Sequence, residues 1–195
     1  MSGIINTILS IILALGISTG AANIAETTPE EAVNDFFARL TGGDTQLMES
    51  YVDNSYVNFL ENVKGSDKEM DVLEEEVFEN LEYSVNETRT KGKAAVAKVK
   101  ISNKDFRSVM DEYEKASYKY VMNNLYDEEA IKKEELNAEC VDIYIEEIKK
   151  AAEADSTYEA EILIPMEDDG YSGWRIILSD EIMQATMGGL ELPVE

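Results

Sequence analysis

The chain has 195 residues, 44% of them hydrophobic and 30% charged, and 41 acidic against 17 basic side chains give a formal net charge of −24. So acidic a chain repels phosphate groups and anionic lipid heads, which disfavours nucleic acid and the membrane surface as partners. The sequence contains no histidine, which excludes Ser-His-Asp and Cys-His catalysis and disfavours a zinc site.

The N-terminal segment has the pattern of an export signal. Residues 4–18 form an uncharged apolar run, and small residues follow at positions 19–22, with an expected cleavage site near Ala21, Ala22 or Ala25. No basic residue precedes the run, so an uncleaved anchor is an alternative, because about 20 apolar residues can span a bilayer. A buried helix of a cytosolic protein is the third reading. We expect residues 1–25 to be a signal peptide or membrane anchor outside the core, and 26–195 to form a single domain. No cysteine lies near the cleavage region, which excludes lipid attachment there.

The first predicted helix begins at a capping box. Thr28 is the expected N-cap, Pro29 occupies the first helical position and Glu31 closes the box. Gly42 and the glycine after it end the helix. Apolar residues at i, i+3, i+4 and i+7 predict one buried face, formed by Val33, Phe36, Phe37 and Leu40.

Three further helical segments are expected before the first strand. Asp44 caps a short helix, and a second capping box joins Ser66 to Glu69. Their spacing makes them packing faces without recognisable chemistry. The apolar positions are Leu47, Met48, Tyr51 and Val52, then Tyr56, Phe59, Leu60 and Val63, then Met70, Leu73, Val77 and Phe78.

Period-2 alternation predicts two strands next. Apolar and polar residues alternate over 81–86 and again over 95–101, with a turn at 91–93 between the two segments. One face of each strand should therefore be buried. The inward residues are Leu81, Tyr83 and Val85, then Ala95, Ala97, Val99 and Ile101.

A long helical insertion follows, at about 105–154. Its apolar residues fall into two stripes at helical spacing, which predicts two helices, the second opening at Asp127. Because both stripes need a partner, we expect the helices to pack over one side of the sheet. The stripes are Phe106, Val109, Met110, Tyr113, Tyr120, Val121 and Leu125, then Ala138, Val141, Tyr144, Ile145 and Ile148.

The segment 157–179 reads as a β-hairpin that carries the sole tryptophan, Trp174. Tyr158, Ala160, Ile162 and Ile164 fall on one face with Glu159 and Glu161 opposite, 167–170 supply the turn, and Trp174, Ile176 and Leu178 share one face. Since a buried tryptophan removes roughly 200 Å² from water, Trp174 is the expected centre of the core. A closing helix runs from Ser179 or Asp180 to the glycine pair at 188–189.

This order of motifs resembles the nuclear transport factor 2-like domains (cystatin-like, ketosteroid-isomerase-like) of proteins exported by Gram-positive bacteria. The segments that carry the resemblance are TPEEAVNDFFARLTGGD, then GYSGWRIIL, then MGGL, and it spans about 28–190. It implies an α+β cone, in which N-terminal helices pack on a curved four-stranded antiparallel sheet. The chain departs from the family because its cysteine is not in a lipobox. The long insertion between strands two and three, expected to cap or fill a pocket, is a second departure.

Few residues of the sequence suggest a catalytic, metal-binding or ligand-binding role. Cys140 lies beside Val141 in a helical pattern, which indicates a small buried hydrophobe rather than a reactive thiol. The acidic segment 167–169 lacks the spaced ligands and distal glutamate of a calcium loop, so a solvated turn is favoured there. We assign no catalytic, cofactor-binding or metal-ligating residue and expect no cofactor. A solvated surface is the simplest explanation of the acidic charge, and a basic partner is compatible with it.

Three functional readings remain. The favoured one is a non-catalytic extracytoplasmic binding domain, secreted or N-terminally anchored, with an unidentified protein or a small apolar ligand as its partner. It touches the membrane only through its N-terminal segment and binds no nucleic acid. The second is an isomerase- or cyclase-like enzyme that uses a carboxylate buried beside a tyrosine. The third is a divalent-cation binder.

Overall fold

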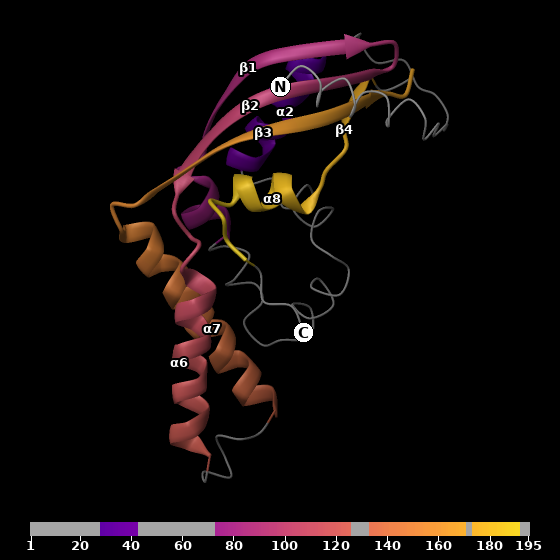
Figure 1. The fold of residues 1–195 in the computed structure, drawn as a ribbon. Helices are drawn as coiled ribbons and strands as arrows, with labels where there is room; N and C mark the ends of the chain where they lie inside the picture. Colours follow the sequence, from indigo (N-terminus) through magenta and orange to yellow (C-terminus); the bar gives the residue numbers. More distant parts are fainter. Residues whose placement is uncertain (1–27, 43–72, 126–132, 171–172, 192–195) are drawn as a thin grey trace.

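A computed structural model describes residues 28–42, 73–125, 133–170 and 173–191 of the chain (Figure 1). The predictions about residues 1–25 and about the helices between 44 and 72 lie outside these ranges. No helix within them is long and apolar enough to cross a membrane. The elements are α2 (Pro29–Thr41), the π-helical turn η1 (Leu73–Phe78), β1 (Glu82–Lys91), β2 (Ala94–Lys104), α6 (Val109–Asn124), α7 (Lys133–Glu153), β3 (Thr157–Asp168), β4 (Trp174–Ile176) and α8 (Asp180–Thr186).

The four strands form one antiparallel sheet in the order β1-β2-β3-β4. This confirms the α+β class and the four-stranded antiparallel sheet with two helices inserted between β2 and β3. The turn between β1 and β2 contains Gly92 with a φ of 61°, a conformation that glycine adopts without steric cost. A bulge between Val85 and Glu87 shifts the β1 register by one residue.

The two faces of the sheet differ as the alternation predicts. On the inner face, Ala97, Val99 and Ile101 of β2 are buried, and the register places Ile162 beside Val99. On the outer face, the Lys98 ammonium lies 2.7 Å from the Glu161 carboxylate, and Lys100 pairs with Glu159 at 3.1 Å. The Lys100–Glu159 pair is exposed, and such pairs contribute at most about 1 kcal/mol. The outer face is therefore solvated at this pair, whereas at the other end of β2 the outward residues Ala94 and Val96 are buried.

Helix α2 begins with the predicted capping box. The Thr28 hydroxyl accepts a hydrogen bond from the Glu31 amide at 3.2 Å, and the Glu31 carboxylate accepts one from the Thr28 amide at 2.6 Å. The Phe37 ring stacks on the Tyr83 ring of β1 with a centroid distance of 4.2 Å. All four predicted core residues of the helix are buried: Val33, Phe36, Phe37 and Leu40. The capping box thus starts a helix whose apolar face lies on the inner side of the sheet (Figure 1).

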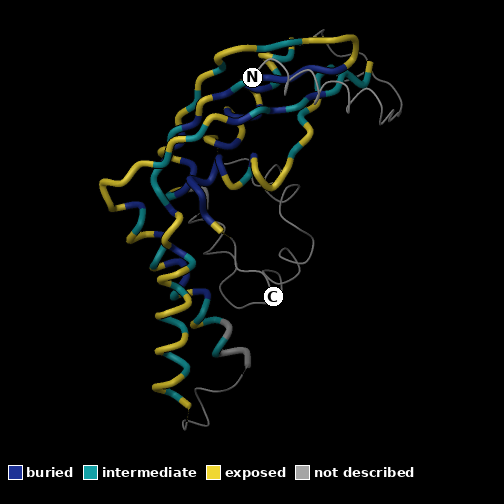
Figure 2. The backbone as a smooth tube through the Cα atoms, viewed as in Figure 1, coloured by how far each residue is buried: buried dark blue, intermediate teal, exposed yellow. Residues whose placement is uncertain are grey.

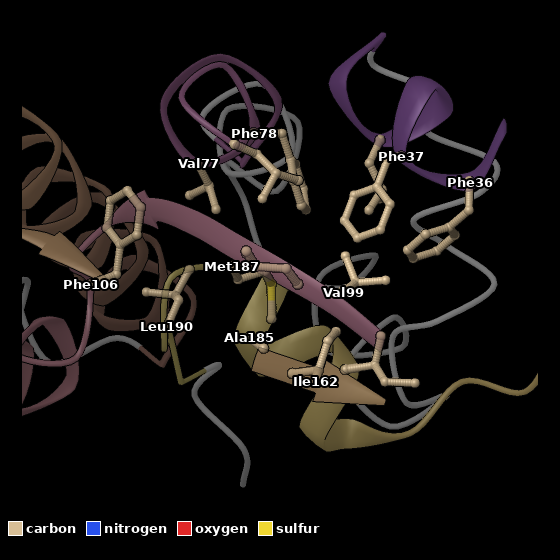
Figure 3. Packing of buried hydrophobic residues seen from close by; sticks show 14 of the residues in the cluster. Phe36, Phe37, Val77, Phe78, Val99, Phe106, Ile162, Ala185, Met187 and Leu190 are labelled. Carbon is tan, nitrogen blue, oxygen red and sulfur yellow. The ribbon is translucent and has the colours of Figure 1, made fainter. Parts of the chain in front are cut away.

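The core is centred on β2 rather than on the tryptophan. Side chains from α2, η1 and the segment after α8 gather around this strand (Figure 3). Trp174 is only half-buried, so the prediction that it is the buried centre of the core is wrong. The reason is its position, since it pairs with Asp168 at the end of a β4 that has three residues. The largest fully buried side chains include Tyr144, Phe37, Phe78 and Phe106.

The insertion forms two helices, as predicted, but the prediction that they pack over the sheet is wrong. Helices α6 and α7 lie against each other and project beyond the end of the sheet as an arm (Figure 1). The inner face of the sheet is already covered by α2, η1 and α8, and the two apolar stripes face each other. Val121 is half-buried and Ile145 is buried. The arm, defined as α6 and α7, therefore joins the core at its base and projects from the surface beyond it (Figure 1).

Candidate functional site

The base of the arm is part of the core. One face of α7 supplies Val141, Tyr144, Ile145 and Ile148, all buried as the sequence predicts. The Tyr144 hydroxyl donates a hydrogen bond to the Glu191 carbonyl at 2.9 Å, and its ring meets the Tyr113 ring of α6 edge-on at 5.5 Å. This tyrosine therefore joins both helices of the arm to the C-terminal segment.

A polar clasp, formed by Asp105 and Arg107, lies in the link between β2 and α6, where the arm leaves the sheet. The Arg107 guanidinium donates to both carboxylate oxygens of Asp105, at 2.9 and 2.7 Å, and lies 5.6 Å from the Tyr158 ring centroid. The hydrogen bond from Arg107 lowers the pKa of Asp105 below its ordinary value, so this carboxylate is ionised at neutral pH. A bidentate arginine–carboxylate pair fixes the relative orientation of the two side chains in addition to attracting them.

The glycine pair after α8 lies at the same place, where the arm joins the sheet. Gly188 has a φ of 63°, and a Cβ built there would collide with the Lys104 carbonyl. The Gly188 carbonyl in turn accepts a hydrogen bond from the Phe106 amide at 3.0 Å. The MGGL segment thus lets the chain after α8 pass close to the link between β2 and α6, which only glycine permits at this φ.

Cys140 lies on the arm where α7 meets α6. Its side chain is half-buried, less than predicted. Burial raises the pKa of the Cys140 thiol, and a hydrogen bond with Tyr113 partly offsets that effect. A thiol with a raised pKa carries little thiolate at neutral pH and is a weak nucleophile. The interpretation of Cys140 as a packing residue therefore fits its surroundings.

The most unusual surface of the arm is an apolar stripe on α6, made of Tyr118, Met122 and Leu125. These residues follow the spacing i, i+4 and i+7, which places them on one helix face. Their exposed fractions are 67%, 48% and 44%. Figure 2 shows α6 with exposed residues along the side that faces away from α7. The helix therefore has two apolar faces, of which one packs against α7 and the other is open to solvent.

This stripe was not predicted from the sequence. Leu125 was expected to pack inward, whereas it is exposed in the structure. The available signal was that Tyr118 and Met122 lie four residues apart but outside the stripe of Tyr113 and Tyr120. A second apolar face on one helix indicates either a deeper core or a partner.

The arm as a whole is acidic. Helix α6 carries three acids against two lysines, and α7 carries seven acids against three lysines. The ammonium group of Lys115 lies 2.7 Å from the Glu112 carboxylate, and that of Lys150 lies 2.7 Å from Glu147. The net acidic charge of the arm and of the whole chain therefore favours a cationic molecule over an anionic one, although Lys115 and Lys119 are the charged residues beside the stripe together with Glu114.

Glu167 and Asp168 belong to the end of β3, where they pair with Arg175 and Trp174, so the prediction that they form the turn is wrong. The Asp168 carboxylate accepts a hydrogen bond from the Gly170 amide at 2.8 Å, and Gly170 has a φ of 75°. No group of three or more metal-ligating side chains occurs among the described residues. Within those residues the fully buried polar side chains are Asn103 and Thr186, neither of which is a carboxylate.

Comparison with known proteins adds little to these observations. No protein-family model and no curated protein matches the chain. Among solved structures, the chain is similar to ycdA of Bacillus subtilis subsp. subtilis str. 168, a protein provisionally named a lipoprotein, with 20% sequence identity and a TM-score of 0.47. The match covers 85% of this chain and 48% of that protein, so the chain spans about half the length of ycdA. Likeness at this level does not assign a family.

Proposed function

We propose that this protein is a non-catalytic interaction domain and that the arm is its contact element. The observation that carries this proposal is the apolar stripe of Tyr118, Met122 and Leu125, which is exposed on a helix that projects from the body of the domain. Large apolar side chains gathered on one exposed face are typical of interaction surfaces. A protein partner suits this surface better than a small apolar ligand, because small-molecule sites are concave.

The proposal extends to the location of the protein and to its superfamily. The uncharged run at residues 4–18 supports an extracytoplasmic protein, either secreted or held by its N-terminal segment. The four-stranded antiparallel sheet with α2 on its inner face supports the nuclear transport factor 2-like cone. Fractionation of producing cells and the mass of the mature chain test the location. Recovery of the full-length protein in the cytosol would exclude export.

Site-specific photocrosslinking in the producing cells tests the contact surface. A photoreactive amino acid placed at Met122 should form a covalent adduct with a discrete partner protein. The same group placed at Ile177, which is 40% exposed and lies after β4 rather than on the arm, is the matched control. Adducts at position 122 that are absent at 177 would support the proposal. Equal adduct yields at both positions, or none at 122, would contradict it.

The isomerase-like alternative is tested by titration of the carboxyl groups. Such an enzyme needs an acid that desolvation keeps protonated near neutral pH beside a tyrosine hydroxyl. NMR titration of the carboxyl groups of the whole chain tests for such an acid, and its absence would favour the interaction domain. One carboxyl group that titrates near pH 7 beside a tyrosine would favour the enzyme over the interaction domain.

A further inference from the structure

We infer that the occupant of the apolar stripe is a basic amphipathic helix of another protein. This inference rests on the proposed function and adds the chemical class of the partner. Three kinds of observation support it: the geometry of the stripe, the charge around it and its size.

The geometry of the stripe suits a helix. Tyr118, Met122 and Leu125 span two turns, or about 10 Å along the α6 axis. Such a row of side chains is a ridge, and ridges of this kind pack into the grooves of another helix. An apolar row at i, i+4 and i+7 on the partner would match it in length and spacing.

The acidic charge of the protein favours a cationic helix as the partner. The chain has a net charge of −24, and the two arm helices together carry ten acids and five lysines. On α6, exposed Asp111 and Glu114 precede Tyr118 by one to two turns and exposed Lys115 and Lys119 lie beside it, so the acidic excess comes from the arm and the chain as a whole. Lysines or arginines that flank the apolar row of a partner would meet these carboxylates, whereas an acidic helix would be repelled.

The size of the stripe argues against a second copy of this chain as the occupant. Three partly exposed side chains of at most roughly 200 Å² each offer well under the ~800 Å² that each partner of a stable interface buries. Two copies would also bring together two bodies of charge −24. A small contact of this kind suits a weak, salt-sensitive complex with an oppositely charged partner.

Titration of the full chain with designed peptides tests the inference. The probe is a 20-residue amphipathic helical peptide with leucines on one face and lysines on the other, and its binding is measured by fluorescence anisotropy. Two companion peptides replace every lysine by glutamate or by glutamine. The protein variants are the triple change Tyr118→Gln, Met122→Gln and Leu125→Gln, which uses a good helix former, and Ile177→Gln as the control.

The inference predicts that the lysine peptide binds at least about tenfold more tightly than the other two. The triple variant should weaken that binding by at least about tenfold, and Ile177→Gln should leave it unchanged. Circular dichroism verifies that both variants keep their helix content. Equal binding of the glutamine and lysine peptides would overturn the inference about charge but leave the arm as the contact element.

Binding of the lysine peptide that the triple variant does not weaken would overturn both the inference and the proposed function. So would the absence of binding by all three peptides. Analytical ultracentrifugation of the wild type and the triple variant tests whether a second copy of this chain occupies the stripe. A dimer in the wild type that the triple variant loses would identify a second copy and overturn the basic helix.

Discussion

Replacement of Asn103 by alanine is expected to destabilise the domain strongly, because this buried side chain joins three elements. Its amide nitrogen on β2 donates to the Val77 carbonyl of η1 at 2.9 Å and to the Thr186 carbonyl of α8 at 2.8 Å. Its oxygen accepts a hydrogen bond from the Lys104 amide at 2.7 Å. Alanine removes these partners and leaves the three backbone groups in a buried position.

The size of the effect follows from the two carbonyl groups. A buried polar group that loses its partner costs about 1–3 kcal/mol, so two carbonyls give a loss of about 2–6 kcal/mol. That is a large part of the ~5–15 kcal/mol that stabilises an ordinary domain. Urea unfolding followed by circular dichroism measures the change in the free energy of unfolding.

Asn123→Ala is the matched control, because Asn123 is exposed on α6. A surface change of this kind should stay within about 0.5 kcal/mol of the wild type. If Asn103→Ala behaved like Asn123→Ala, the interior hydrogen bonds of Asn103 would not hold η1 and α8 to β2, and the reasoning would be refuted.

Three further predictions concern the core and the base of the arm. Gly188→Ala should cost more than about 2 kcal/mol in thermal or urea unfolding, because φ is 63° and the methyl group collides with the Lys104 carbonyl; Gly92→Asn, in the β1–β2 turn, should be tolerated, and equal losses would contradict this. Phe37→Ala should cost about 3–5 kcal/mol and more than Trp174→Ala, since Phe37 is fully buried and Trp174 is not; Trp174 emission that acrylamide cannot quench would contradict the second part. Asp105→Asn should destabilise the protein at pH 7. The pKa of Asp105 is lowered in the folded state from 3.8, so its contribution to stability is present above pH 3.8 and is lost as the pH falls below that value. A stability difference between the wild type and Asp105→Asn that did not shrink in acid would contradict the role of the clasp.

The elements of the fold that depend on local pattern were predictable from the sequence. The capping box at Thr28 and the alternation through Val99 are local signals, and both lead to the predicted element. The second helix of the insertion was also predictable on its buried face, since Tyr144 and Ile148 repeat at helical spacing. Each of these predictions needs only neighbours in the sequence.

The features that the sequence did not predict depend on how elements that are distant in the sequence pack against one another. A large apolar side chain such as Trp174 favours a buried position. Its actual burial depends on where the sheet ends, and β4 ends two residues after it. The apolar stripe on the arm was missed for a related reason. Both faces of α6 are apolar, and only the position of α7 decides that Tyr113 packs inward while Tyr118 is exposed.

Amide hydrogen exchange with and without the lysine peptide tests the central claim, that the open face of α6 is the binding surface. At saturating peptide, the exchange of amides between Tyr118 and Leu125 should slow, because a helix packed on the stripe suppresses local opening of α6. Amides of α2 and of the exposed strand β1 should exchange as in the free protein. Protection confined to β1 or α2, with none on α6, would contradict the claim.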